Sequence, residues 1–252
     1  LLEGVDVLVH LAGEPIFGRF NDSHKSDIRD SRVGPTENLA RLVAATDSVQ
    51  AMVCASAIGF YGSERGAELL SEDAERGEGF LADVVADWER ACDPAREAGK
   101  RVVNIRTGIV MSGNSGLLPL LRALFSTGLG GAFGDGNFWY SWVALDDLTD
   151  AYIRAIVDEK LAGPVNGASP NPVLNKDFVS ALGSELHRPT ILPIPQFGPA
   201  LLLGKQGAQE LALADQRVQP QILKDIGHTF RYPTIDAALA HELGGESLWE
   251  SP

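Results

Sequence analysis

The chain has 252 residues, of which 44% are hydrophobic and 22% are charged, and its formal net charge is −13. These values are typical of one large globular domain, or of one domain with an appendage. The negative charge and the lack of basic runs argue against nucleic acid as a partner, because phosphate backbones are bound by clustered Lys and Arg. Prolines interrupt the apolar residues 191–203, so we expect no membrane span. With no signal-like segment, and with Cys54 and Cys92 in apolar surroundings, we expect a cytoplasmic protein.

Strands and helices alternate along the first half of the chain. Residues 5–10, 50–55 and 101–106 are short apolar runs of the kind that form central parallel strands covered on both faces. Residues 22–45 between the first two runs have helical spacing, with Pro35 allowed in the first turn of the later helix. Between the second and third runs, one helical face is formed by Phe80, Val84, Trp88 and Cys92.

The second half predicts further helices. We expect a helix from Asp146 to Val157, capped at its N-terminus by Asp146 or its neighbours. Beyond residue 175, proline-rich connectors separate predicted helices at residues 176–186, 208–214, 220–226 and 235–243. The sequence therefore predicts an α/β fold with a Rossmann-type, doubly wound parallel sheet in residues 1–170. It also predicts a small, mainly helical region in residues 171–252, on the substrate side and without further sheet.

Ligands of open α/β sheets bind beyond the carboxyl ends of the strands, which draws attention to three loops. In the first, Ala12 and Gly13 form a small-residue turn that lets the backbone approach a flat ligand. The second offers the hydroxyl groups of Ser56 and Tyr61, and the third begins with Arg106. Each loop also has a structural interpretation, namely a tight connection, a tyrosine packed under its loop and an arginine paired with a neighbouring helix.

Several motifs occur in the order found in one family. They are HLAGEP, SRVGPT, ASAIGFYG, LSED, DWE, RTGIVMSG, GLGG, FGDGNFWYSWVALDDL, GPVNGASPNPV and LHRP. In this order they resemble an atypical group of extended short-chain dehydrogenases/reductases, the NAD-dependent epimerase-like or sugar-nucleotide epimerase group. The closing stretch, residues 207–239, resembles the small C-terminal domain of unknown function that accompanies this group.

The resemblance implies that a strand, a GxxGxxG turn and a helix come before the first predicted strand. Those elements grip the pyrophosphate of NAD(P), and no such glycine motif precedes Val5 in this sequence. We therefore expect a longer polypeptide, with roughly 50 further residues judged from the size of a βαβ half.

A second departure from the superfamily concerns the residues that transfer protons. The superfamily uses a Ser or Thr after the second predicted strand and a Tyr-x-x-x-Lys pair on the next helix. Aligning Tyr61 with the usual tyrosine-glycine pair puts Ala57 at the hydroxyl position, one residue after Ser56. Aligning Glu89 with the usual helix glutamate puts Leu81 and Val85 at the Tyr and Lys positions, and a shift of one residue gives Phe80 and Val84. The usual structural asparagine of the preceding helix is replaced by Arg32.

The resemblance implies an NAD(P)-dependent epimerase-like oxidoreductase acting on a small substrate or on a nucleotide sugar, with NAD or NADP as cofactor. Leu11, Ala12 and Gly13 are expected on the adenine side of the cofactor, and Ser56, Arg106, Thr107 and Ile109 on the nicotinamide side. Ser56 and Tyr61 are the predicted catalytic residues. The alternatives are a non-catalytic dinucleotide-binding or sensing protein, and a module of a larger polypeptide.

The remaining polar and aromatic candidates have mainly structural interpretations. Glu14 and Asp83 are further acid or base candidates, and Arg32 is a candidate for contact with an anionic group. His10 ends a buried strand and is expected to be a hydrogen-bonded core residue, and the five histidines show no spacing typical of a metal site. An aromatic run is expected mostly in the core: Phe138, Trp139, Tyr140 and Trp142. The family resemblance implies that this run lies beside the substrate crevice, where an apolar wall is normal.

Overall fold

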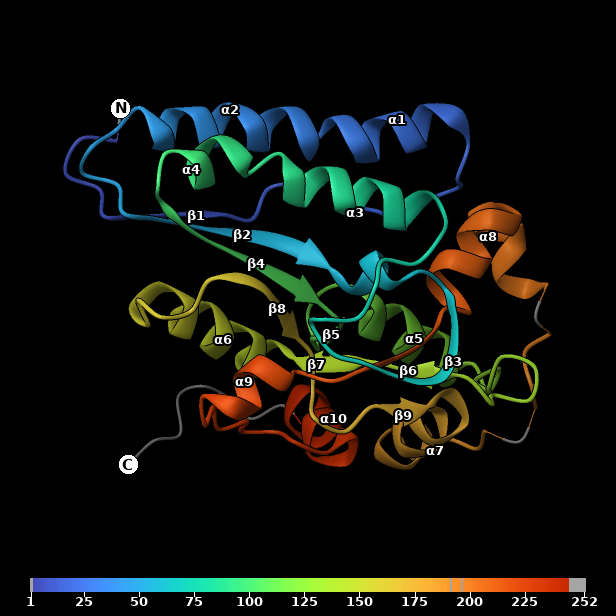
Figure 1. The fold of residues 1–252 in the computed structure, drawn as a ribbon. Helices are drawn as coiled ribbons and strands as arrows, with labels where there is room; N and C mark the ends of the chain where they lie inside the picture. The colour runs from blue at the N-terminus through green and yellow to red at the C-terminus, as the bar shows by residue number, and fades with distance from the viewer. Residues whose placement is uncertain (1, 191, 196, 245–252) are drawn as a thin grey trace.

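A four-stranded parallel sheet forms the centre of the N-terminal part of the molecule. The computed structural model describes residues 2–190, 192–195 and 197–244. The strands are ordered β1 (Val7–His10), β2 (Ala51–Ala57), β4 (Arg101–Thr107) and β8 (Gly163–Gly167). Their carboxyl ends point to the right-hand side of Figure 1. The predicted Rossmann-type sheet is confirmed, and the three predicted strands lie within two residues of the observed ones.

Helices cover both faces of this sheet, above and below it in Figure 1. On one face lie α1 (Asp22–Asp30), α2 (Val33–Ala44), α3 (Phe80–Arg90) and α4 (Asp93–Glu97), and on the other lies α6 (Leu145–Val157).

Alternating side chains of the strands explain this arrangement. Met52 and Cys54 of β2 pack with Trp88 of α3, whereas the intervening Val53 packs with Leu148 of α6. Because successive side chains of a strand point to opposite faces, an unbroken apolar strand needs helices on both sides. Both cysteines are buried and free, as expected of packing residues.

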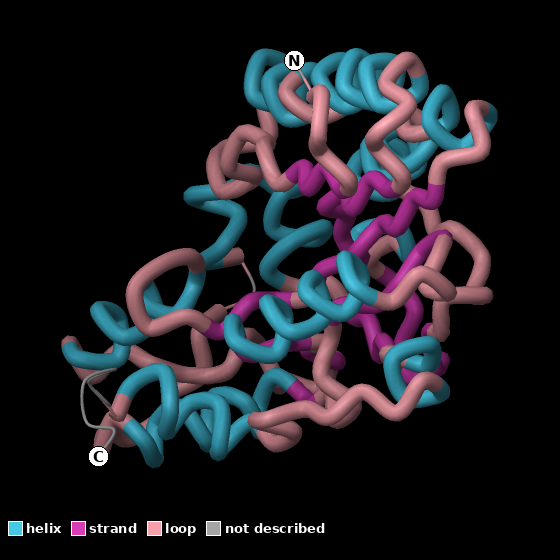
Figure 2. Tube along the Cα trace, turned by 90° about the vertical axis from the view of Figure 1, so that its left-hand side faces the viewer, coloured by secondary structure: helices cyan, strands magenta, loops and turns pink. Residues whose placement is uncertain are grey.

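A second group of elements follows β4 and has a hydrophobic core of its own. In Figure 2, short strands lie among helices and loops in the lower part of the molecule. β5 (Ile109–Met111) pairs in parallel with β7 (Trp142–Ala144), and β6 (Trp139–Tyr140) pairs in antiparallel with β9 (Val173–Leu174). α5 (Leu117–Ser126), α7 (Asn175–Glu185) and α10 (Ile235–Leu243) pack around them. The buried residues of this core come from both sides of residue 170, and include Met111, Phe125, Trp142, Phe178, Leu182 and Leu239.

The C-terminal region is mainly helical, as predicted, but the expectation that it adds no strand was wrong. Besides α7 and α10 it contains α8 (Gly198–Gly207), the π-helical turn η2 (Ala208–Ala212) and α9 (Gln221–Asp225). It also contributes β10 (Asp215–Val218), which pairs in parallel with β3 (Glu64–Leu70). Neither strand has the alternating apolar pattern that would have predicted it. Within the described ranges, no helix is both long enough and apolar enough to cross a bilayer.

The predicted N-cap of α6 was also wrong. The N-cap position is held by Ala144, without a side-chain bond. Asp147 is only 1% exposed and instead accepts hydrogen bonds from the backbone N–H groups of Arg231, at 2.6 Å, and Tyr232, at 3.1 Å. Asp146 is bonded to Nε2 of His241 at 3.1 Å. These two carboxylates therefore hold the C-terminal region against α6.

Candidate functional site

The loop after β1 presents exposed backbone at the carboxyl edge of the sheet. Residues 11–15 are all exposed and have no regular secondary structure. Arg32 donates from Nη2 to the carbonyl of Glu14 at 2.9 Å, and the N–H of Glu14 donates to Oγ of Ser31 at 3.0 Å. A Cβ atom at Gly13 would lie 3.1 Å from Cζ of Arg32. The arginine therefore holds the loop in place, and a side chain at position 13 would press against its guanidinium.

Arg32 itself is held by protein groups. Its Nη1 donates to the carbonyl of Ile28 at 3.0 Å, and its guanidinium lies 5.2 Å from the ring centroid of Trp88. Its predicted contact with an anionic substrate group stays a prediction.

The ends of β2 and β4 are both bonded to one carboxylate of α3, β4 through an ion pair and β2 through a hydrogen bond. Arg106 donates from Nε and Nη2 to the two carboxylate oxygens of Glu89, at 2.8 and 2.9 Å, and its side chain is only 4% exposed. Ser56 donates from Oγ to the same carboxylate at 2.6 Å. Glu89 lies on α3, so this bidentate pair ties the helix to the two central strands.

The same arginine is packed against two aromatic rings. Its guanidinium lies 3.5 Å from the ring centroid of Phe60 and donates from Nη1 to Oη of Tyr61 at 3.1 Å. Tyr61, on the 3-10 turn η1 (Ile58–Tyr61), is fully buried and donates to Oδ1 of Asn166 at 2.7 Å. Burial raises the pKa of Tyr61, although Arg106 opposes this. For Arg106, burial alone would lower the pKa, but the hydrogen bonds and charge of Glu89 raise it overall.

The loop after β4 is packed more tightly than the loop after β1. Gly108 donates from its N–H to the carbonyl of Gly167 at 3.0 Å, and a Cβ at Gly108 would lie 2.8 Å from the carbonyl oxygen of Ser141. Thr107 and Ile109, on either side of this glycine, are half-buried. The hydroxyl of Tyr152, hydrogen-bonded to Thr107, has its pKa raised to about 12 by burial.

Apolar side chains of α3 face the turn after β2. A Cβ at Gly59 would lie 3.5 Å from Cβ of Leu81 and 3.7 Å from Cγ2 of Val85. These are the two residues that the alignment on Glu89 puts at the superfamily's Tyr and Lys positions.

The predicted site residues thus gather at one edge, but they divide into two groups. Ser56, Tyr61 and Arg106 form a buried network, whereas residues 11–13 are exposed and Thr107 and Ile109 are half-buried. The roles predicted for all of them stay predictions. Sequence reasoning used Glu89 only as an alignment marker and did not single out Asn166. A buried arginine at a strand end demands an anionic partner, and this signal could have led to Glu89.

The other candidates have the following places. Asp83 is exposed and forms an ion pair with Arg76. His10 is 5% exposed and hydrogen-bonded through Nε2 to Oγ1 of Thr36 at 3.0 Å, so its predicted core role is confirmed. The aromatic run is mostly core, as expected, because Phe138, Tyr140 and Trp142 are buried and Trp139 is half-buried.

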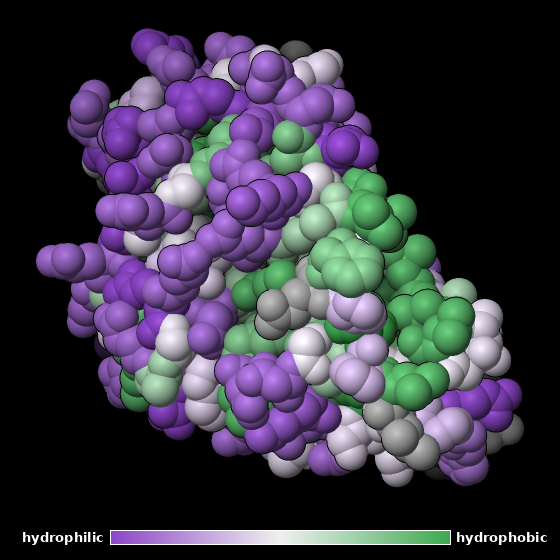
Figure 3. Space-filling view, turned by 90° about the vertical axis from the view of Figure 1, so that its right-hand side faces the viewer, coloured by the Kyte–Doolittle hydropathy of each residue, from purple (hydrophilic) through white to green (hydrophobic). Residues whose placement is uncertain are grey.

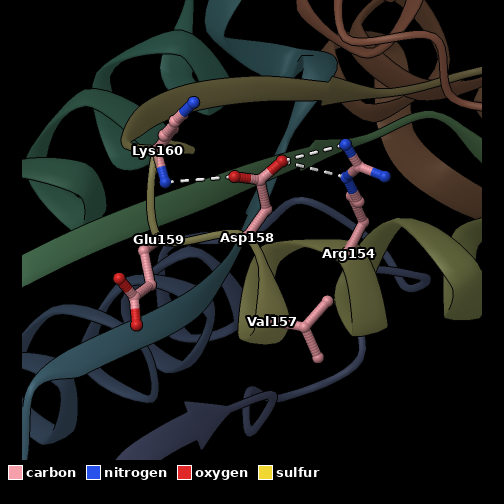
Figure 4. A pocket seen from close by; sticks show the side chains of 5 residues that line it. All are labelled: Arg154, Val157, Asp158, Glu159 and Lys160. Atoms are coloured by element: carbon pink, nitrogen blue, oxygen red, sulfur yellow. Dashed lines mark hydrogen bonds and ion pairs between the residues drawn. The ribbon is translucent and has the colours of Figure 1, made fainter.

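Two shallow hollows lie outside this network. One, of about 440 Å³, is lined by Arg154 and residues 157–160. Figure 4 shows that Asp158 accepts hydrogen bonds there from the side chain of Arg154 and from the backbone N–H of Lys160. These residues bond to one another and form the turn that comes before the amino end of β8. The other, of about 390 Å³, lies where β3, residues 135–138 and the segment of η2 and β10 meet, and carries the carboxylates of Glu64, Asp135 and Asp215.

Apolar side chains gather on the face toward which the strands point. Figure 3 views the molecule from the side where α8 lies and shows an extended hydrophobic surface. Leu201 and Leu202 of α8 are each 70% exposed. An apolar wall beside the carboxyl edge is common in small-molecule sites.

A parallel sheet with helices on both faces and glycine-bearing loops at its carboxyl edge defines a Rossmann-type fold, here of the short-chain dehydrogenase/reductase kind. A family model described as a domain of unknown function (DUF1731) matches residues 194–242. An epimerase family protein of Mycobacterium leprae is 40% identical over 238 residues, which are 94% of this chain and 76% of that protein. The chain belongs to this epimerase family.

Two solved structures are also similar. One is the human epimerase family protein SDR39U1 (isoform 2) with NADPH, at a TM-score of 0.89 and 27% identity, over 96% of this chain and 83% of that one. The other is a nucleoside-diphosphate sugar epimerase of Corynebacterium glutamicum, at a TM-score of 0.79 and 51% identity. The match covers 99% of this chain but only 48% of the Corynebacterium chain, so this chain spans about half of that protein's length.

Proposed function

We propose that this chain is an NAD(P)-dependent oxidoreductase of the epimerase type, with the dinucleotide across the carboxyl ends of β1, β2 and β4. The observation that carries the proposal is the convergence of the exposed loop at residues 11–15 with the ends of β2 and β4 at one edge. The structure of the human relative with NADPH supports it.

The residues present fit part of a dinucleotide. Residues 11–15 are exposed, and hydrogen bonds with Arg32 and Ser31 hold this loop in place. Leu11, Ala12 and Gly13 would border the adenine half of the cofactor, and Thr107 and Ile109 the nicotinamide half. A bound nicotinamide supplies hydride transfer, and the protein supplies orientation and exclusion of water.

The proton transfer that accompanies such chemistry would not use the superfamily's tyrosine-lysine pair. Leu81 and Val85 contact the turn at Gly59, and their side chains have no group that could donate or accept a proton. Ser56 already donates its hydroxyl proton to Glu89, and Tyr61 donates its own to Asn166. An exposed or substrate-borne group would have to act as the acid or base.

We propose a small polyhydroxylated substrate, such as a nucleotide sugar. The hollow lined by Glu64, Asp135 and Asp215 supports this, since carboxylates accept hydrogen bonds from hydroxyl groups. The solved relative from Corynebacterium glutamicum is a nucleoside-diphosphate sugar epimerase, which points the same way.

A second candidate is a protein that binds NAD(P) without turnover. The observation that favours it is the burial of Ser56, Tyr61 and Arg106 in hydrogen bonds to protein groups. Titrating NADPH and NADH into the full-length protein, and assaying oxidation and sugar-nucleotide turnover, separates the two. Binding with turnover supports the enzyme, binding without turnover across a broad panel supports the second candidate, and absence of binding refutes both.

A further inference from the structure

Residues 208–222 cross the carboxyl edge of the sheet, and we call this segment the strap. It lies within the region matched by the domain of unknown function, and it comprises η2, β10 and the beginning of α9. In Figure 1 it runs beside β3, on the side toward which β2 and β4 point.

Gln216 of the strap holds both ends of the turn that follows β2. It is 6% exposed, and its Nε2 donates to the carbonyl of Ile58 at 3.0 Å and to that of Gly62 at 2.5 Å. Both hydrogens of one amide thus close the turn that contains Tyr61. Because the carbonyls are buried against the strap, no solvent replaces these bonds if the amide is lost.

The strap is joined to the segment before β7 as well. Ser141 donates from Oγ to the carbonyl of Gln216 at 2.7 Å and accepts from the N–H of Val218 at 2.8 Å. Asp215 accepts from the N–H of Trp139 at 2.8 Å. One buried serine therefore replaces the backbone partners that β10 lacks on this side.

A carboxylate forms hydrogen bonds at each end of the strap, Glu210 from within it and Glu72 from outside it. Glu210 accepts from the N–H groups of Phe80, at 3.2 Å, and Leu81, at 2.7 Å, and so caps α3. Glu72, which is 7% exposed, accepts from the N–H groups of Asn166, at 2.9 Å, and Gln221, at 3.1 Å. A carboxylate at the first N–H groups of a helix is favourable both as a hydrogen-bond acceptor and toward the helix dipole.

The strap also reaches the buried ion pair indirectly. Asn166 donates from Nδ2 to the carbonyl of Gln219 in the strap at 2.8 Å and accepts from the hydroxyl of Tyr61. Tyr61 in turn accepts from Arg106. The strap therefore contacts the turn after β2, the start of α3, the segment before β7 and the end of β8.

We propose that the strap positions the loops of the cofactor site, and that Gln216 is its central positioning residue. The region of unknown function then serves the site by fixing the turn that carries Tyr61 and the start of α3. Its link to cofactor affinity rests on the proposed function, whereas its hold on the turn does not.

The test replaces Gln216 with glutamate in the full-length protein. A carboxylate keeps the shape of the side chain but cannot donate to the two carbonyls. Gln50→Glu is the matched control, because Nε2 of Gln50 also donates to two carbonyls, those of Asp47 and Ser48, but at an exposed position at the amino end of β2. Hydrogen exchange and NADPH affinity are measured on both variants.

We expect exchange in residues 58–63 of Gln216→Glu to rise about tenfold, the factor that loss of one or two buried hydrogen bonds gives, with β4 unchanged. NADPH should bind several-fold more weakly, and the Gln50→Glu variant should behave as wild type. Unchanged exchange at residues 58–63, or an equal rise along the whole chain, overturns the positioning role. A wild-type protein that does not bind NADPH refutes the proposed function, while the exchange measurement still decides the hold on the turn.

If Gln216→Glu does not fold, Glu210→Ala tests the same strap. It removes the acceptor for the N–H groups of Phe80 and Leu81, and we expect faster exchange confined to the first turn of α3. Exchange in that turn equal to wild type overturns the proposal.

Discussion

Replacing Glu89 with alanine is expected to destabilise the fold strongly, because it leaves the guanidinium of Arg106 buried without a counter-charge. The arginine side chain is 4% exposed and the glutamate side chain 13% exposed. The substitution removes two hydrogen bonds from Arg106 and one from Ser56. Breaking a buried pair by removing one partner costs about 3–5 kcal/mol. In a chain of this length that corresponds to a fall in Tm of roughly 6–20 °C, at about 2–4 °C per kcal/mol.

The assay is equilibrium urea unfolding, with the midpoint and slope compared between variants. Two controls separate charge burial from loss of packing. Adding Arg106→Met to Glu89→Ala removes the stranded charge and should recover a large part of the loss. Glu68→Ala breaks the exposed pair with Arg65 and should leave the midpoint near wild type. The reasoning is refuted if Glu89→Ala unfolds at the wild-type midpoint, or if the double variant is less stable than the single one.

Three further predictions concern the loop after β1, the core, and the carboxylate of Glu72 that accepts a hydrogen bond from the strap. Gly13→Val places a side chain against the guanidinium of Arg32 and should weaken NADPH binding about tenfold in a fluorescence titration, whereas Gly34→Ala, with no atom within 4 Å of the new Cβ, should bind normally. Thr36→Val removes the acceptor of the Trp88 indole N–H and the partner of His10, and should cost about 1–3 kcal/mol in urea unfolding; a wild-type midpoint contradicts it. Burial raises the pKa of Glu72 above its ordinary value, so its stabilising contribution is full below the unfolded-state pKa of about 4.3 and declines as the pH rises through the folded-state pKa. Between these two pKa values, the unfolding free energy of the Glu72→Gln variant should therefore fall less steeply with pH than that of the wild type. Equal pH slopes for the two proteins contradict this prediction.

Local pattern was enough to predict three of the four strands of the sheet and most of its helices. The fourth strand, β8, has the sequence GPVNG, which reads as a turn and not as an apolar strand. Val53 and its neighbours in β2 form an unbroken apolar run, and Val84 and Trp88 share a helical face, so elements and layers could be assigned from spacing alone. The sequence DQRV of β10 has no such run. It is a strand because Ser141 and β3 bond to it, and those partners lie far away in the sequence.

The sequence predicted where the site residues lie, but not which hydrogen bonds join them. Ser56 and Arg106 were placed at the carboxyl edge because they end apolar strands, and this is where the structure has them. That Glu89 receives bonds from both depends on how α3 packs on the sheet. Asp147 illustrates the same limit of local reasoning. Next to a helix start it looks like a cap, but its carboxylate binds backbone N–H groups more than 80 residues further along the chain.

The central claim is that the loops after β1, β2 and β4 form one cofactor cradle. A crystal structure of the full-length protein with NADP+ tests it most directly. The account predicts the adenosine half along residues 11–13 and the nicotinamide beside Thr107 and Ile109. A dinucleotide bound at the opposite edge, beside Arg154 and Asp158, would contradict it.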